Sequence, residues 1–108
     1  MTMMEGRPIK FRLLEIYSES SPWNYEVVKK LQIEYDMKSD YGRDCINWDI
    51  AEIAAGGMLK QLDIKMDDDG SLYGKPDSLC TKYTISNIGK EYLSSLKANL
   101  HHKKNKEV

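Results

Sequence analysis

Apolar residues recur at helical spacing near the start of the sequence. Ile9, Leu13, Ile16 and Tyr17 fall at positions i, i+4, i+7 and i+8, which lie on one face of an α-helix. The pattern predicts a helix from Pro8 to about Glu19, and proline suits the first turn because its missing N–H would have no partner there. The first predicted element is therefore an amphipathic helix.

Two further helices follow by the same criterion. A serine and a proline at residues 21–22 are typical of an N-cap followed by the first helical residue, and this helix is expected to end near Asp36. Its apolar positions are Val27, Leu31 and Tyr35. The apolar face of the third helix consists of Ile46, Ile50, Ile53 and Ala54. Gly56 and Gly57 end that helix, since glycine adopts the left-handed conformation of a C-cap without steric cost.

The period then changes from that of a helix to that of a strand. Residues 58–66 partly alternate, which predicts a strand. The apolar side chains expected on one of its faces are Leu62, Ile64 and Met66. Residues 67–71 predict a turn, because Asp-Gly supplies the positive φ angles that a hairpin needs. After a loop up to Ser78, a second strand is expected from Leu79 to Ile85.

A last helix is predicted after Ser86, which is a suitable N-cap. Its apolar residues keep a four-residue spacing at Ile88, Tyr92, Leu96 and Leu100. Residues 101–108 are polar. Together with residues 1–7 they are expected to be flexible termini, so the predicted domain spans residues 8–100.

Composition agrees with a single α+β domain. The chain has 108 residues, of which 41% are hydrophobic and 31% charged, so it has enough apolar material for a core. No apolar run approaches the ~20 residues that cross a bilayer, and the first residues do not form a secretory signal. Cys45 and Cys80 fit neither zinc spacing nor a disulfide framework, so we expect a cytoplasmic protein that does not associate with membranes.

Charge is unevenly distributed although the formal net charge is only −1. Residues 36–70 contain nine acidic and four basic side chains, whereas residues 71–108 contain three acidic and seven basic ones. The chain therefore lacks a global basic footprint for nucleic acid.

The sequence offers no catalytic pattern. Asp67, Asp68, Asp69 and Gly70 superficially suggest a calcium loop, but the spaced acids and the final glutamate of an EF-hand are missing. The histidines lie at residues 101–102, in a predicted flexible end, so a nucleophile would lack a rigid base. We predict that the chain is not an enzyme and holds no metal or cofactor.

The order of elements and two local sequences resemble the winged-helix domain of small prokaryotic and archaeal transcriptional regulators. Residues 54–59, Ala-Ala-Gly-Gly-Met-Leu, are similar to the turn from the third helix into the first strand. Residues 83–93 are similar to the passage from the second strand into the helix after the wing, where Ser86 caps the helix and Gly89 permits close packing. Residues 23–31 resemble the second helix of such regulators. The resemblance covers about residues 8–100 and carries more information about fold than about function.

This resemblance implies a winged helix-turn-helix: a three-helix core, a two-stranded hairpin wing and a C-terminal helix. The third helix would enter the major groove of double-stranded DNA while the wing contacts the backbone. Such domains usually act as dimers through long terminal helices. The residues expected at a homodimer interface are Leu93, Leu96 and Leu100.

Candidate DNA-binding residues lie on and beside the third helix. Arginine can bind guanine and asparagine can bind adenine through paired hydrogen bonds, so Arg43 and Asn47, together with Tyr41, are expected to read bases. Phosphate contacts are expected from Lys38, Lys75 and Lys29. The alternative is that Arg43 pairs with Asp40 or Asp44 and that Asn47 merely faces solvent.

Trp48 lies opposite the isoleucine face of the third helix and is expected to be one of the DNA-binding residues. Either another part of the chain covers it in the core, or it belongs to an interface, where tryptophan is enriched.

Acidic residues on this helix and at the predicted wing tip argue against strong phosphate binding. The rival hypothesis is therefore a winged-helix protein-interaction module whose acidic third helix and wing meet a basic partner.

Overall fold

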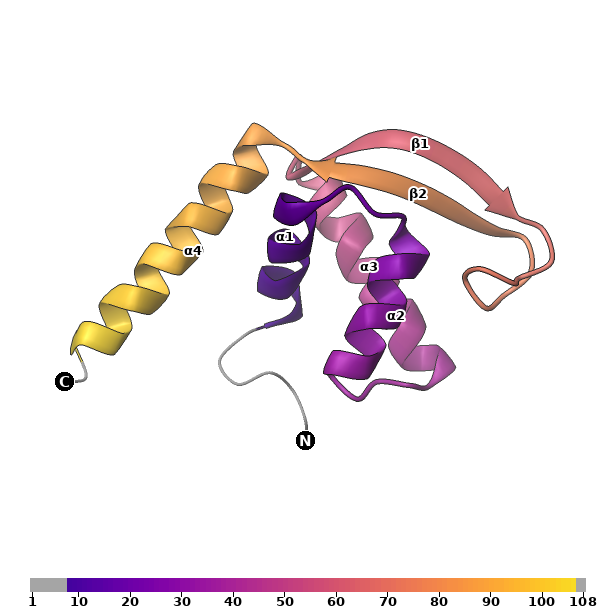
Figure 1. The fold of residues 1–108 in the computed structure, drawn as a ribbon, viewed down its shortest axis with the longest axis horizontal. Helices are drawn as coiled ribbons and strands as arrows, with labels where there is room; N and C mark the ends of the chain where they lie inside the picture. Colours follow the sequence, from indigo (N-terminus) through magenta and orange to yellow (C-terminus); the bar gives the residue numbers. More distant parts are fainter. Residues whose placement is uncertain (1–7, 107–108) are drawn as a thin grey trace.

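The computed structural model describes residues 8–106, with the side chains of residues 8–99. Within this range a helical core is followed by a two-stranded antiparallel hairpin and a long last helix (Figure 1). In chain order the elements are α1 (Ile9–Glu19), α2 (Asn24–Glu34), α3 (Asp40–Ala55), β1 (Leu59–Asp67), β2 (Ser78–Ile85) and α4 (Asn87–Lys106). The predicted α+β class and the predicted order of elements are confirmed.

The helical core forms where the predicted apolar faces of α1, α2 and α3 meet. Ile46, Ile50 and Ile53, the face expected for α3, are buried. The largest enclosed side chains from α1 and α2 are Leu13, Leu14, Tyr17, Val27, Val28 and Leu31. Each enclosed Leu, Ile or Val contributes roughly 1.5–3 kcal/mol relative to an exposed one. This three-helix core therefore fixes the orientation of α3.

The start of α2 differs from the prediction. The helix begins at Asn24, after an N-cap at Trp23, and not at Pro22. The carboxylate of Glu26 accepts a hydrogen bond from the backbone N–H of Trp23 at 2.8 Å, which satisfies one of the free donors at the helix start. The carbonyl of Pro22 accepts a hydrogen bond from the N–H of Tyr83. Residues 22–23 are therefore held against β2 before the helix can begin.

The hairpin pairs Leu59 with Ile85 at its base and Asp67 with Ser78 at its far end, with one irregularity between Gln61 and Asp63. The apolar side chains expected on one face of β1, namely Leu62, Ile64 and Met66, are about half exposed. Cys80 and Ile85 of β2 belong to the buried core, whereas nothing among the described residues fully covers these three side chains of β1. The strand was predicted correctly, but its apolar face is not a core face.

The turn into α4 is built as the sequence predicted. The hydroxyl of Ser86 accepts a hydrogen bond from the N–H of Gly89 at 3.1 Å and donates one to the carbonyl of Gly57 at 2.6 Å. A Cβ atom at Gly89 would lie 2.3 Å from the carbonyl oxygen of Met58, so only glycine allows this approach. From this anchor α4 runs past α1 and away from the hairpin (Figure 1). It continues to Lys106, beyond residue 100, where the sequence placed the end of the domain.

Candidate nucleic-acid interface

α3 begins at a cap that requires a glycine at the third residue of the helix. The hydroxyl of Ser39 accepts a hydrogen bond from the N–H of Gly42 at 3.0 Å. A Cβ atom at Gly42 would lie 2.7 Å from the carbonyl oxygen of Met37. The chain before α3 therefore lies close against the first turn of the helix, which fixes where α3 begins.

Two aromatic side chains occupy the outward face of α3. Tyr41 is 79% exposed and Trp48 is 72% exposed. With Asp44, Cys45 and Asp49 they line a hollow of about 420 Å³. The interpretation of Trp48 as a core residue is therefore wrong, because no other described part of the chain folds over it.

Arg43 does not point outward, although it was the first candidate for reading bases. It is only 9% exposed, and its Nε donates to Asp44 at 3.0 Å. Its Nη1 lies 3.4 Å from Asp40 and donates to the carbonyl of Gly74 at 3.1 Å. The alternative, in which Arg43 pairs with Asp40 or Asp44, is confirmed.

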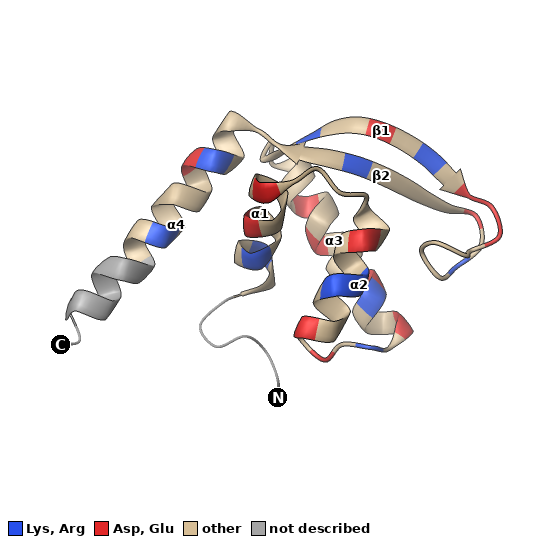
Figure 2. Cartoon of the chain, viewed as in Figure 1, with Lys and Arg blue, Asp and Glu red and all other residues tan. Residues whose placement is uncertain are grey.

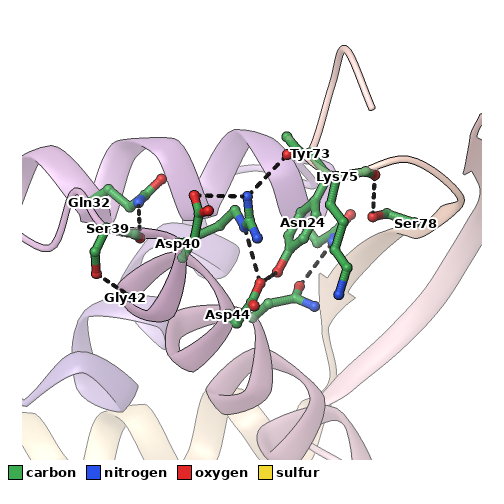
Figure 3. Close-up of polar contacts among 12 residues, drawn as sticks. Asn24, Gln32, Ser39, Asp40, Gly42, Asp44, Tyr73, Lys75 and Ser78 are labelled. Atoms are coloured by element: carbon green, nitrogen blue, oxygen red, sulfur yellow. Dashed lines mark hydrogen bonds and ion pairs between the residues drawn. The ribbon is translucent and has the colours of Figure 1, made fainter. Parts of the chain in front are cut away.

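The partners of Arg43 join α3 to the loop of residues 68–77 between the two strands, called here the wing loop. The hydroxyl of Tyr73 donates to Asp44 at 2.7 Å (Figure 3), and the guanidinium of Arg43 lies 5.0 Å from the centre of the Tyr73 ring. We call the set Arg43, Asp44, Tyr73 and Gly74 the clasp. It folds the wing loop back onto the first half of α3.

Asp67, the last residue of β1, supports the clasp from just before the wing loop. Its buried carboxylate accepts hydrogen bonds from the N–H groups of Leu72 at 3.0 Å and Tyr73 at 2.8 Å. Asp68 and Asp69 beside it are exposed. The first acid of the Asp-Asp-Asp run therefore shapes the loop, whereas the other two face solvent.

The clasp also changes the titration of its members. Hydrogen bonds from Arg43 and then from Tyr73 lower the pKa of Asp44 below its ordinary value. Burial, and after it the hydrogen bond to Asp44, raises the pKa of Tyr73 to about 12. Asp44 is therefore ionised and Tyr73 protonated at neutral pH, which are the forms that this hydrogen bond requires.

Asn47 is half-buried beside α2 and does not merely face solvent. Its side-chain oxygen accepts a hydrogen bond from the side-chain nitrogen of Asn24 at 2.9 Å. Asn24 is buried, and its own oxygen accepts the backbone N–H of Thr81 on β2 at 2.9 Å. This chain of amides connects α3, α2 and the wing.

The three lysines predicted to contact phosphates are all exposed: Lys29 on α2, Lys38 before α3 and Lys75 in the wing loop. Lys65 on β1 instead lies over the ring of Trp23, with its Nζ 4.3 Å from the ring centre. Figure 2 shows acidic positions on α3 and at the start of the wing loop, and basic positions on the strands and on α4. The outward surface around α3 is therefore of mixed charge.

The terminal helix presents a different apolar face from the predicted one. Leu93 is buried in the core of the single chain and Leu96 packs partly against that core, whereas Ile88 is 58% exposed and Tyr92 46% exposed. The side chain of Leu100 lies outside the described residues. α4 packs on the core through Gly89 and Leu93, each one residue after the predicted Ile88 and Tyr92. This face is used because Gly89, which has no Cβ, lets α4 lie close to Met58.

Sequence reasoning missed Asn24, Asp67 and Tyr73. Each is a polar or aromatic residue whose partner lies in another element or several residues along a loop. No local pattern marks such residues, because the pairing depends on the tertiary fold.

Neither a metal site nor a membrane-spanning helix is found among the residues that the structure describes. Among them, no group of three or more His, Cys, Asp or Glu side chains could hold a metal ion. No helix within the same residues is long and apolar enough to span a bilayer.

The fold is similar to that of a PadR-like transcriptional regulator from Bacillus cereus strain ATCC 14579. The two structures superpose with a TM-score of 0.63 over 91% of this chain and 85% of the other, at 17% sequence identity. The predicted winged-helix fold is therefore confirmed. No family model and no curated protein sequence matches this chain significantly.

Proposed function

We propose that this chain is a transcriptional regulator that binds double-stranded DNA, with α3 in the major groove and the wing loop against the backbone. The observation that carries this proposal is the clasp, which unites the outward face of α3 and the wing loop into one surface. A winged helix contacts DNA through these same two parts. The similarity in fold to a transcriptional regulator supports the same function.

The contacts are assigned by exposure. Tyr41 and Trp48 face outward and contact base edges, while Asn47 keeps its amide nitrogen as a donor. Arg43 is a positioning residue, since its guanidinium already binds Asp44 and the wing loop.

Phosphate contacts come from the exposed lysines around this surface. Lys38 precedes α3, Lys75 lies in the wing loop beside the clasp, and Lys29 lies on α2. Each lysine that neutralises a phosphate releases a condensed counterion, so affinity depends on salt concentration.

We also propose a homodimer through α4. Ile88, Tyr92 and Leu96 present apolar surface, and a groove of about 390 Å³ lies beside them between α1, α3 and α4. Pairing by a two-fold axis is the commonest way to cover such a face, and it would place two copies of α3 on one duplex. Leu100 is expected to extend this interface, whereas Leu93 is left out because it belongs to the core of the single chain.

Titration of a random-sequence duplex tests the DNA proposal. We expect binding at about 50 mM salt that weakens steeply by about 200 mM. Lys75→Ala should lower the slope of log K against log salt by about one, whereas Lys90→Ala on α4 should leave it unchanged. Absence of binding at about 50 mM salt would reject this function.

The acidic side chains on the outward face of α3 favour a second candidate function, a protein-interaction module that binds a basic partner through α3 and the wing. Asp40 is almost fully exposed, and Asp44 and Asp49 line the hollow beside Trp48. Carboxylates at these positions repel phosphates and attract cations. Duplex titration separates the two functions, because only the DNA-binding regulator binds the random-sequence duplex.

A further inference from the structure

The hollow on α3 combines two aromatic faces with two carboxylates. Its lining consists of Tyr41, Asp44, Cys45, Trp48 and Asp49. Tyr41 and Trp48 are seven residues apart, so their Cα atoms are separated by ~10.5 Å along the helix axis. A cation seated midway, over Cys45, would lie ~5 Å along the helix axis from each of these Cα atoms. Side chains as long as Tyr and Trp can bring their rings from there to within the ~6 Å over which cation–π attraction acts.

The charge of the hollow also selects a cation. Asp49 is half-buried. The nearby Lys10 makes its ion pair with Glu52 at 2.9 Å and acts on Asp49 only through its charge. Asp44 gives one oxygen to Arg43 and Tyr73 and is still 39% exposed. The five residues of the lining include no basic side chain.

We infer that this hollow receives an arginine or lysine side chain carried on an extended segment of a partner protein. The charged group lies between Tyr41 and Trp48, and Asp49 supplies the opposite charge. This inference deepens the second candidate function and does not require DNA binding.

The shape of the hollow favours a polypeptide over a free small molecule. A small-molecule pocket encloses most of its ligand between several elements. Here all five lining residues belong to α3, so the hollow has a floor but no opposite wall. A segment that lies along the helix covers such a surface, and its neighbouring residues supply the remaining contact area.

Trp48 fluorescence reports directly on this site. Trp23, the second tryptophan, is replaced by Phe in every variant so that the signal comes from Trp48 alone. The probe is the peptide Gly-Arg-Gly-Arg-Gly with blocked ends, and its control contains citrulline, which has the shape of arginine without the charge. We expect the arginine peptide to change the fluorescence and to bind about tenfold more tightly than the citrulline peptide.

Variants followed by calorimetry locate the binding. Trp48→Leu should weaken the arginine peptide about two- to fivefold, as expected for loss of a cation–π contact at an exposed site. Asp49→Asn should weaken it by a similar factor, whereas Glu91→Gln, a neutralised carboxylate on α4, should change nothing. Circular dichroism checks that each variant is folded.

The outcomes separate this inference from the proposed functions. If the arginine peptide binds equally well to the parent protein and to Trp48→Leu, the hollow is not the binding site. A broader acidic interaction surface then remains as the explanation. If the arginine and citrulline peptides bind equally well, the inference that the hollow recognises a positive charge is wrong. No peptide binding by a protein that binds duplex DNA overturns the inference and the interaction function together, and leaves the DNA-binding function standing.

Discussion

Removal of one hydroxyl group tests the clasp. Tyr73→Phe deletes the donor of the 2.7 Å hydrogen bond to Asp44 and keeps the ring beneath Arg43. A hydrogen bond to a charged group is worth about 1.5–3 kcal/mol, but Asp44 is 39% exposed, so water can replace the lost donor. The carboxylate also keeps its bond from Arg43. We therefore expect a loss of about 1 kcal/mol in the free energy of unfolding, below the usual range for a charged bond.

Urea denaturation measures this loss as a shift of the midpoint by about 0.5 M with an unchanged slope. Tyr92→Phe is the matched control, because it removes a hydroxyl from a half-exposed tyrosine on α4, and it should stay within about 0.5 kcal/mol of the parent. If Tyr73→Phe loses no more stability than Tyr92→Phe, the hydroxyl does not hold the wing loop to α3.

The same hydroxyl gives the clasp a dependence on pH. The pKa of Tyr73 is raised from 10.0 to about 12, first by burial and then by Asp44. The folded state therefore keeps this proton when the unfolded chain loses it, and the contribution to stability is complete below pH 10 and disappears between pH 10 and 12. The difference in stability between the parent and Tyr73→Phe should decline over this interval. A difference that stays constant up to pH 12 would contradict the assigned pKa.

Two further experiments test the packing of α4 and the proposed dimer. Gly89→Ala should lower the free energy of unfolding by at least about 1–3 kcal/mol, because the new Cβ would lie 2.3 Å from the carbonyl oxygen of Met58. Gly56→Ala is the control: its Cβ would lie no nearer than 3.5 Å to any other atom, so the loss of stability should be far smaller. Thermal unfolding of the two variants measures the difference. The double substitution Ile88→Lys with Tyr92→Lys should convert a dimer into a monomer of 12.5 kDa, measured by light scattering. Circular dichroism should show an unchanged helix content. A parent protein that is already monomeric would contradict the proposed dimer.

Local patterns were sufficient to predict the elements. The helical spacing of Ile46, Ile50 and Ile53 identified the buried face of α3, and Ser86 with Gly89 identified the start of α4. These predictions succeed because amphipathic periodicity and capping depend on residues only a few positions apart.

The functional surface could be predicted only in part. Arg43 was a candidate for base contacts because of its position at the start of α3, yet its partner Gly74 lies 31 residues further along the chain. Nothing in the sequence near Arg43 indicates that the wing loop folds back onto it. The sequence likewise does not decide whether Trp48 is exposed. Helical spacing shows that Trp48 lies opposite the core face, but not whether another element covers it.

The apolar stripe on α4 illustrates a similar limit. Spacing grouped Ile88 with Tyr92 correctly, but it did not determine which side of the helix meets the core. The close approach at Gly89 rotates the packed face by one residue, and this leaves Ile88 and Tyr92 exposed.

Mapping of backbone amide chemical shifts during titration with duplex DNA tests the central claim most directly. If α3 and the wing loop form one DNA-binding surface, the largest changes should fall in residues 38–48 and 71–77, and they should diminish together as salt is added. Changes confined to α4, or to one of these two segments while the other stays unaffected, would contradict the account.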